Sequence, residues 1–321
     1  MAQATSYSTA GNREDLTDAI SILEPESTPF ISMMKKGKAT GTFVEVQVDR
    51  LKTSSFNGVS EGEDVGSFSN QAEDRARIGN YVQKFRQTWK VSDIQQLVDT
   101  AGVASEKANS EGKCVRQIKR DIEGAFCSAQ DRQAEAGSVT PYKTRGMLKW
   151  LGVGGQPSDV PTFAHNVAND TTGTQPEATF NSVLQELYTA NGMPGGQLTL
   201  IAGPSLKQEI SNFSRQLAAT NGTYVVNQDA ESKKITLSVN LYDGDFGQVS
   251  IISSLFVNRT SGSDTVDADA GLLIDPEYVS MESLQAESVT ELENQGGGQR
   301  GFVSLIAGLC CNSPKAHGFF N

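Results

Sequence analysis

Two stretches near the front of the chain alternate between apolar and polar residues. They are residues 44–49 (VEVQVD) and 81–91 (YVQKFRQTWKV). Because successive side chains of a strand point to opposite sides, each stretch predicts a strand with one apolar face. Lys84 and Arg86 lie on the polar face of the second strand. We expect these two strands to match each other, which leaves residues 50–80 as a long excursion between them.

The excursion over residues 50–80 contains four glycines and few apolar side chains. A connection of that length inside a compact domain is uncommon and is usually functional or disordered. It has too little apolar content to bury its own backbone, so we expect it to lie on another chain. Its acids come first and its bases follow, which makes the segment complementary to a second copy of itself. The alternative is a mobile acidic loop beside an ordinary strand. The candidate contact residues are Glu61, Glu63, Asp64, Arg75, Arg77, Lys84 and Arg86.

Helical spacing follows the second strand. Apolar residues recur every three or four positions from Val91 to about Ala136, and most regularly over residues 113–136. Gly102 and Gly112 are expected to bend or interrupt this helix, because a helical glycine costs about 1 kcal/mol relative to alanine. A shorter helix is predicted over residues 12–23, before Pro25.

The second half of the chain alternates between helical and extended patterns. Residues 137–176 are rich in glycine, proline and small polar residues, and we interpret them as loops that join two subdomains. Beyond them we predict an amphipathic helix over 180–188 and a second helix that opens at Pro204. The predicted strands cover residues 198–202, 224–226, 272–274, 279–281 and 303–311, with a hairpin over 235–251. These elements give a mixed α+β class.

Charge narrows the possible functions. The formal net charge is −11, whereas a protein that grips nucleic acid needs clustered Lys and Arg, so tight general binding of DNA or RNA is disfavoured. Residues 260–299 carry nine acids and no base, which is typical of a solvated face or of a surface that faces a polyanion without holding it. We find no signal peptide and no apolar run of about 20 residues, and therefore expect a protein that is made in the cytosol and enters no membrane.

Residues suited to catalysis or metal binding are scarce. A dyad of Cys310 or Cys311 with His317 lacks neighbours that would lower a thiol pKa, and no second ligand pair supports a metal site. The four cysteines are expected to stay reduced. Aromatic and basic residues of the 81–91 strand could stack on bases, but a strand of a sheet explains them better. We therefore expect no catalytic residue, no metal and no cofactor, and a chain that is not an enzyme.

Several short motifs, spread in order over the chain, resemble one protein family. They are NREDL at 12–16, TPF at 28–30, GKA at 37–39, GDFG at 244–247, LLIDPEY at 272–278 and NSPKAHG at 312–318. In this combination the chain resembles the major capsid (major head) proteins of tailed bacteriophages, which have the Johnson fold, also called the HK-ninety-seven type.

The resemblance implies a domain organisation. Residues 1–41 would form an N-terminal arm and residues 42–90 an extended β-hairpin loop that lies on a neighbouring subunit. Residues 91–176 would hold the spine helix and the first part of a peripheral domain, residues 177–275 an axial domain, and residues 276–321 the C-terminal strands of the peripheral domain.

The resemblance also implies a function and partners. The chain would be made in the host cytoplasm and assemble with itself into hexamers and pentamers of an icosahedral virion shell. The shell would enclose double-stranded DNA without sequence-specific binding. A portal is an expected partner, as is a separate scaffolding protein, because no scaffolding segment of about a hundred residues fits before the arm. The alternatives are an encapsulin-like compartment shell with the same fold and, less favoured, a hydrolase or a surface carbohydrate-binding protein.

Overall fold

The computed structural model describes residues 26–321, apart from residues 73, 99–101, 138, 171–175, 192–196, 221–227, 230–233, 236–238, 264 and 266. Residues 191, 214–220, 228–229 and 234–235 are described by their backbone only. The helix predicted over 12–23 and the strand predicted over 224–226 lie outside the described residues.

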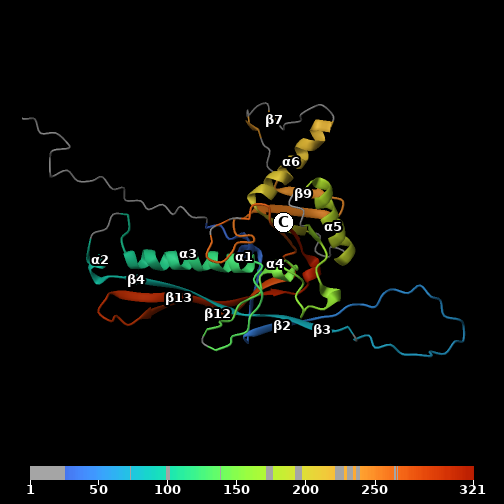
Figure 1. Cartoon of the computed structure of the whole chain (residues 1–321), viewed down its shortest axis with the longest axis horizontal. Helices are drawn as coiled ribbons and strands as arrows, with labels where there is room; N and C mark the ends of the chain where they lie inside the picture. The colour runs from blue at the N-terminus through green and yellow to red at the C-terminus, as the bar shows by residue number, and fades with distance from the viewer. Residues whose placement is uncertain are drawn as a thin grey trace, which may run out of the picture.

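An elongated four-stranded sheet with one long helix on it forms one end of the molecule (Figure 1). Its strand order is β1 (Lys35–Lys38), β12 (Val279–Leu292), β13 (Gln299–Cys311) and β4 (Gln83–Val91), with β1 parallel to β12 and the other pairs antiparallel. The helix, α3 (Glu106–Phe126), packs on the face that carries Phe85 and Trp89. Phe85 meets Phe126 edge to face with ring centroids 6.5 Å apart, so the alternation in β4 does select the buried face.

The long helix ends earlier than its apolar spacing predicts. Ser105 caps it by accepting a hydrogen bond from the amide of Ala108, and it stops at Phe126, so the prediction of helix over residues 113–136 is wrong after that point. The Ser128 hydroxyl donates to the carbonyl of Ala125, which satisfies one of the last helical carbonyls. The chain then turns back, and Gln133 pairs with Lys143. Between β4 and α3, the described residues 92–98 and 102–105 include one helix, the short α2 (Asp93–Leu97).

The front hairpin differs from its prediction in one strand. β2 (Phe43–Val48) pairs antiparallel with β3 (Ala76–Tyr81), while the predicted partner, residues 81–91, mostly forms β4 in the other sheet. Gly79 explains why the return strand lies at 76–81. A Cβ there would come within 2.7 Å of the carbonyl oxygen of Val44, so only glycine allows the two strands this close approach.

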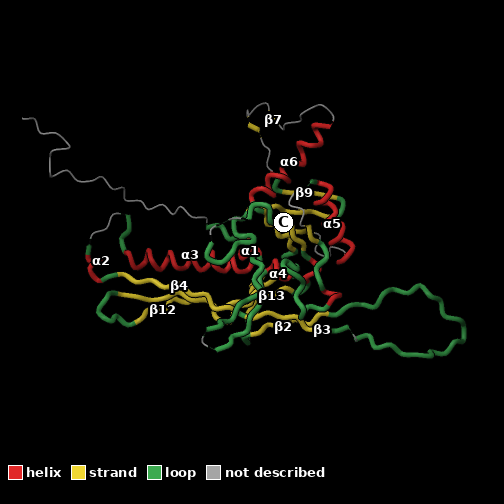
Figure 2. Tube along the Cα trace, viewed as in Figure 1, coloured by secondary structure: helices red, strands yellow, loops and turns green. Residues whose placement is uncertain are grey.

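A second, six-stranded sheet forms the other half. Its order is β5 (Asn169–Asp170), β14 (Gly318–Phe320), β11 (Gly271–Ile274), β6 (Gln197–Ala202), β10 (Gly247–Ser253) and β9 (Leu241–Gly244). The helices α5 (Glu177–Asn191) and α6 (Pro204–Thr220) pack on it (Figure 2), and α6 opens at Pro204 as predicted. Phe180 stacks on Phe320 with ring centroids 5.3 Å apart, which joins the end of the chain to this half.

The described part of the chain has two hydrophobic clusters. One lies between α3 and the four-stranded sheet and continues to one face of the six-stranded sheet, at Ile201, Leu272 and Phe319. The other lies between the opposite face of the six-stranded sheet and α5 and α6. The remaining segments include α1 (Pro29–Met33), α4 (Met147–Trp150) and two 3-10 turns, Thr162–Ala164 and Pro314–Ala316. A two-residue pair, β7 (Gln228–Asp229) with β8 (Lys234–Ile235), stands apart from both sheets. Within the described part of the chain, no helix combines the length and the apolar character that crossing a bilayer requires.

The acidic segment 260–299 contains more structure than predicted. The strand predicted over 279–281 extends to Leu292 as β12, and the final strand begins at Gln299 and not at Val303. Cross-strand pairing with β13 continues along this whole length, with register shifts between Ser283 and Ser288. Beyond β1, β12 is the exposed edge of the sheet, where charged side chains reach water, so its acids do not prevent strand formation.

Candidate inter-subunit surface

A long loop between β2 and β3 leaves the rest of the molecule (Figure 2). Among its described residues, 49–72 and 74–75, none belongs to a helix or strand. Its apolar side chains are almost fully in water: Leu51 is 95% exposed, Phe56 96% and Phe68 92%. Isolated exposed apolar residues are ordinary, but three large ones on a single projecting loop mark an interaction surface.

The neck of this loop is fastened to its own subunit. Arg50 pairs with Asp74 at 2.8 Å and Arg75 pairs with Asp49 at 3.1 Å, which joins the two arms of the loop where they leave the hairpin. The guanidinium of Arg50 also lies 5.4 Å from the ring centroid of Phe163. These pairs are exposed, so each adds little to the stability of the fold, but together they fix the direction in which the loop leaves the subunit.

The structure separates the seven predicted contact residues into three places. Glu61, Glu63 and Asp64 are exposed at the far end of the loop, where Glu63 accepts a hydrogen bond from the amide of Ser60. Arg75 lies at the neck and is paired with Asp49, as described above. The others occupy the strands: Arg77 on β3, 3.8 Å from Glu45, and Lys84 and Arg86 on β4.

Lys84 and Arg86 belong to a basic sheet face. They point away from α3, on the exposed side of β4, and Lys90 continues the row two positions beyond Thr88. Across the sheet, Lys84 lies beside Ile306 of β13 and Thr88 beside Phe302, and both of these apolar residues are only half buried. This face therefore combines cations with neighbouring apolar residues. It is complementary to the loop, which combines acids at its far end with exposed aromatic rings.

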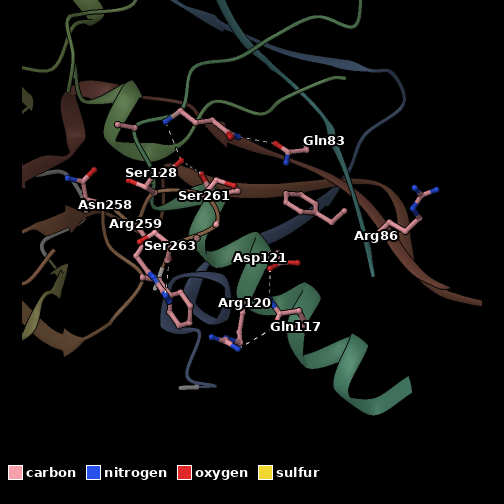
Figure 3. A pocket seen from close by; sticks show the side chains of 18 of the residues that line it. Gln83, Arg86, Gln117, Arg120, Asp121, Ser128, Asn258, Arg259, Ser261 and Ser263 are labelled. Atoms are coloured by element: carbon pink, nitrogen blue, oxygen red, sulfur yellow. Dashed lines mark hydrogen bonds between the residues drawn. The ribbon is translucent and has the colours of Figure 1, made fainter. Parts of the chain in front are cut away.

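A cavity of about 730 Å³ lies between α3, β4 and residues 256–263 (Figure 3). Its polar side chains bond to one another: Gln117 donates to Asp121 at 2.8 Å, and Gln130 donates to Gln83 at 3.0 Å. Asp121 is the one acid among its lining residues, which include no histidine or cysteine. Such a lining offers neither a nucleophile with a base nor a pair of carboxylates.

The residues of the conceivable cysteine–histidine dyad are part of the core. His317 is buried, its Nδ1 accepts a hydrogen bond from the amide of Asp275, and burial lowers its pKa to about 3. Burial raises the pKa of the Cys310 thiol to about 11 and that of Cys311 further. A neutral thiol is a poor nucleophile, so this cluster is structural. The described residues include no group of three or more His, Cys, Asp or Glu that could hold a metal ion.

The family model for the SU10 major capsid protein matches residues 3–321 of the chain. The chain belongs to this family. The major capsid protein of Escherichia phage Phieco32 is 30% identical to it over 129 residues, which are 40% of this chain and 36% of that protein. The alignment thus spans about a third of the length of this relative.

Solved capsid structures share the fold over nearly the whole chain. The capsid protein of Cyanophage P-SCSP1u has a TM-score of 0.59 at 12% identity, over 99% of this chain and 94% of that one. That of the mature capsid of bacteriophage PhiM1 has a TM-score of 0.61 at 10% identity, over 98% and 94%. A likeness at this low identity shows the fold alone, and that fold is the one expected from the sequence.

Family and fold together confirm the main expectations. The chain is a major capsid protein of the tailed-phage type, a structural component of the virion, with the α+β fold of these shells. The sequence signal for the projecting loop was its low apolar content. No sequence signal marked its exposed apolar residues or the ion pairs at its neck, because neither set of residues follows a helical or strand periodicity.

Proposed function

We propose that this SU10-family major capsid protein forms the hexamers and pentamers of an icosahedral shell that encloses double-stranded DNA. The observation that carries the proposal is the loop over residues 49–75, which is anchored at its neck and exposes Phe56 and Phe68 to water. Burying each ring stabilises an interface by roughly 2 kcal/mol, and the described part of the subunit leaves both rings uncovered. A second copy of the chain supplies it.

We propose the same division into domains that the sequence suggested. The N-terminal arm covers residues 1–41 and the extended loop 42–90. The peripheral domain combines residues 91–176 with 276–321, and the axial domain covers 177–275. The cluster around α5 and α6 supports the axial domain, while the cluster around α3 also includes Ile201, Leu272 and Ile274 and so joins the two domains. In this arrangement the last strand, β14, crosses over to complete the axial sheet.

The acidic end of the loop is proposed to lie on the basic sheet face of the neighbouring subunit. Glu61, Glu63 and Asp64 would face Lys84 and Arg86 of that copy, while Arg75 and Arg77 hold the hairpin neck. Charge complementarity of this kind fixes the register of an interface and speeds its formation more than it adds affinity. The aromatic rings of the loop would supply the affinity.

A separate scaffolding protein and a portal are proposed as further partners, from the family resemblance. An encapsulin-like compartment shell is the alternative with the same fold, and the contents of purified particles distinguish the two: nucleic acid for a phage head, an enzyme for a compartment. Matches to phage capsid proteins favour the first.

The proposal is tested by replacing residues 52–72 with a short Gly-Ser linker, which keeps both neck ion pairs. We expect a protein with the thermal stability of the wild type that forms no hexamers, pentamers or shells in negative-stain electron microscopy. Loss of the folded subunit on deletion would show that the loop belongs to its own core and would refute the proposal.

A charge-reversal pair tests the contact itself. E61K/E63K and K84E/R86E should each slow assembly followed by light scattering, and mixing the two proteins should restore part of the rate because each supplies the surface that the other needs. The matched control is K38E/K143E, which reverses two exposed charges elsewhere. Equal effects of K84E/R86E and the control, which change the net charge by the same amount, with no gain on mixing, would show that only net charge matters.

A further inference from the structure

The hairpin of β2 and β3 carries the projecting loop, yet neither of its strands pairs with a strand of the two large sheets. It joins the body through Val82, between β3 and β4, and through residues 39–42, between β1 and β2. One face of the hairpin packs on the body through the buried Ile78 and through Asn80, whose amide donates to the carbonyl of Leu309. Contact on one face alone leaves the hairpin free to tilt, so its angle also depends on what holds the opposite face.

Arg132 holds this opposite face. Side chains alternate along a strand, so Phe43 and Tyr81 lie on the side of the hairpin away from Ile78. The guanidinium of Arg132 donates to the carbonyl oxygen of Gly79 at 2.6 Å and lies 5.0 Å from the ring centroid of Phe43. Both are attractive contacts, a charge-assisted hydrogen bond and a cation–π interaction. One side chain thus grips both strands of the hairpin.

The same guanidinium is anchored to the core of the subunit. Arg132 pairs with Asp159 at 3.3 Å, and that carboxylate accepts two hydrogen bonds from Arg145, at 3.1 and 2.6 Å. Arg145 is buried and lies 4.6 Å from the ring centroid of Trp150. Burial of Asp159 opposes its ionisation, yet the two arginines hold its pKa below the usual value. The carboxylate therefore stays charged and connects Arg132 to a fixed point of the core.

We infer that Arg132 is a positioning residue for assembly, which holds the hairpin at the angle at which the loop over residues 49–75 reaches a neighbouring copy. The inference rests on the proposed shell function. The arm from residue 49 to residue 61 spans at most about 40 Å, so a tilt of about 10° at its base moves the loop end by up to about 7 Å. A shift of that size exceeds the reach of an ion pair. A loop that samples several angles binds less well, because only the competent fraction can bind.

The first measurement follows the hairpin in the full-length, unassembled chain. Spin labels on Gln47→Cys, in β2, and Lys113→Cys, on α3, report the distances between hairpin and body by pulsed electron resonance. The four native cysteines are buried and should take up no label. Arg132→Gln should widen the distance distribution about twofold, whereas Arg132→Lys keeps the charge without the planar fork and should widen it less.

The second measurement is the rate of assembly, followed by light scattering. Arg132→Gln should slow assembly at least about fivefold because fewer hairpins are at the competent angle, and Arg132→Lys should slow it less. Arg116→Gln makes the same change of residue and charge on α3, beside Glu26. Ile118→Val weakens the core without changing the contacts of Arg132. Both controls should assemble within about twofold of the wild-type rate, since they leave the competent fraction unchanged.

Three results would overturn the inference: an unchanged distance distribution in Arg132→Gln, a widened distribution with the wild-type rate of assembly, or equal slowing in either control. Negative-stain electron microscopy of the same preparations separates this inference from the proposed function. If the wild type forms shells and Arg132→Gln forms them at the same rate, the positioning role is wrong and the shell proposal stands. If the wild type forms no shells, the shell proposal fails and the inference fails with it.

Discussion

Glu123 offers a direct test of how the front of the chain is held to the spine helix. Its carboxylate is buried on α3 and accepts hydrogen bonds from the amides of Phe30, at 2.8 Å, and Ile31, at 2.9 Å, at the start of α1. Burial raises its pKa from 4.5 to about 7, against the opposing effect of these two hydrogen bonds. The carboxyl thus fastens residues 30–31 to α3 with a charge that is costly to bury.

The sign of the effect on stability follows from proton binding. Between pH 4.5 and 7 the folded state holds a proton on Glu123 that the unfolded state has released, so the free energy of unfolding falls as the pH rises. At 1.36 kcal/mol per pKa unit, the loss between pH 5 and pH 8 is about 2.5 kcal/mol. Above pH 8 it levels off, because both states are then ionised.

Glu123→Gln isolates this contribution. The variant never ionises at this position. Its amide group places a second donor against one backbone N–H, which costs about 1 to 3 kcal/mol relative to the protonated carboxyl, and this cost does not change with pH. Relative to the wild type, its free energy of unfolding should therefore rise by about 2.5 kcal/mol from pH 5 to pH 8. Urea unfolding of the unassembled proteins measures the difference in free energy of unfolding between the variant and the wild type. Contributions from groups that both proteins share, such as His317, cancel in this difference.

The matched control is Glu106→Gln, which removes a carboxylate from the first turn of the same helix where it is not buried. Its profile should run parallel to that of the wild type. A difference between Glu123→Gln and the wild type that stays constant within about 0.5 kcal/mol over this pH range would refute the reasoning, since the buried carboxyl would then not titrate as inferred.

Two further predictions concern stability. Asn80→Ala should lower the free energy of unfolding by about 3 to 5 kcal/mol, because the buried amide donates to the carbonyls of Arg145 and Leu309 and accepts from the amide of Arg145 at 2.7 Å. Unfolding near the wild-type midpoint would show that water replaces these bonds. Gly112→Ala should raise stability by about 1 kcal/mol, since nothing occupies the space of its Cβ, whereas Gly146→Ala should lower it, since its Cβ would lie 2.1 Å from the carbonyl oxygen of Ser128. Paired thermal scans measure both, and equal shifts in one direction would contradict the packing argument.

The elements with strong local periodicity could be predicted from the sequence. The alternation of residues 83–91 defines β4 and the side of it that packs on α3, and Pro204 opens α6 where its fixed φ predicts. The polarity of residues 50–80 indicated a segment without a core of its own. These are properties of near neighbours in the chain, which the amino-acid order specifies directly.

Pairing between distant segments was decided only by the tertiary structure. β2 selects β3 because Gly79 permits close approach, β12 extends through an acidic run because β13 pairs with it, and α3 stops at Phe126 because the chain folds back. The raised pKa of Glu123 likewise depends on α1, which lies 92 residues away in sequence at Ile31. Neighbouring residues in the chain do not specify such contacts, because they depend on which distant surfaces meet. The hydrogen bonds and the burial form only once those surfaces are in contact.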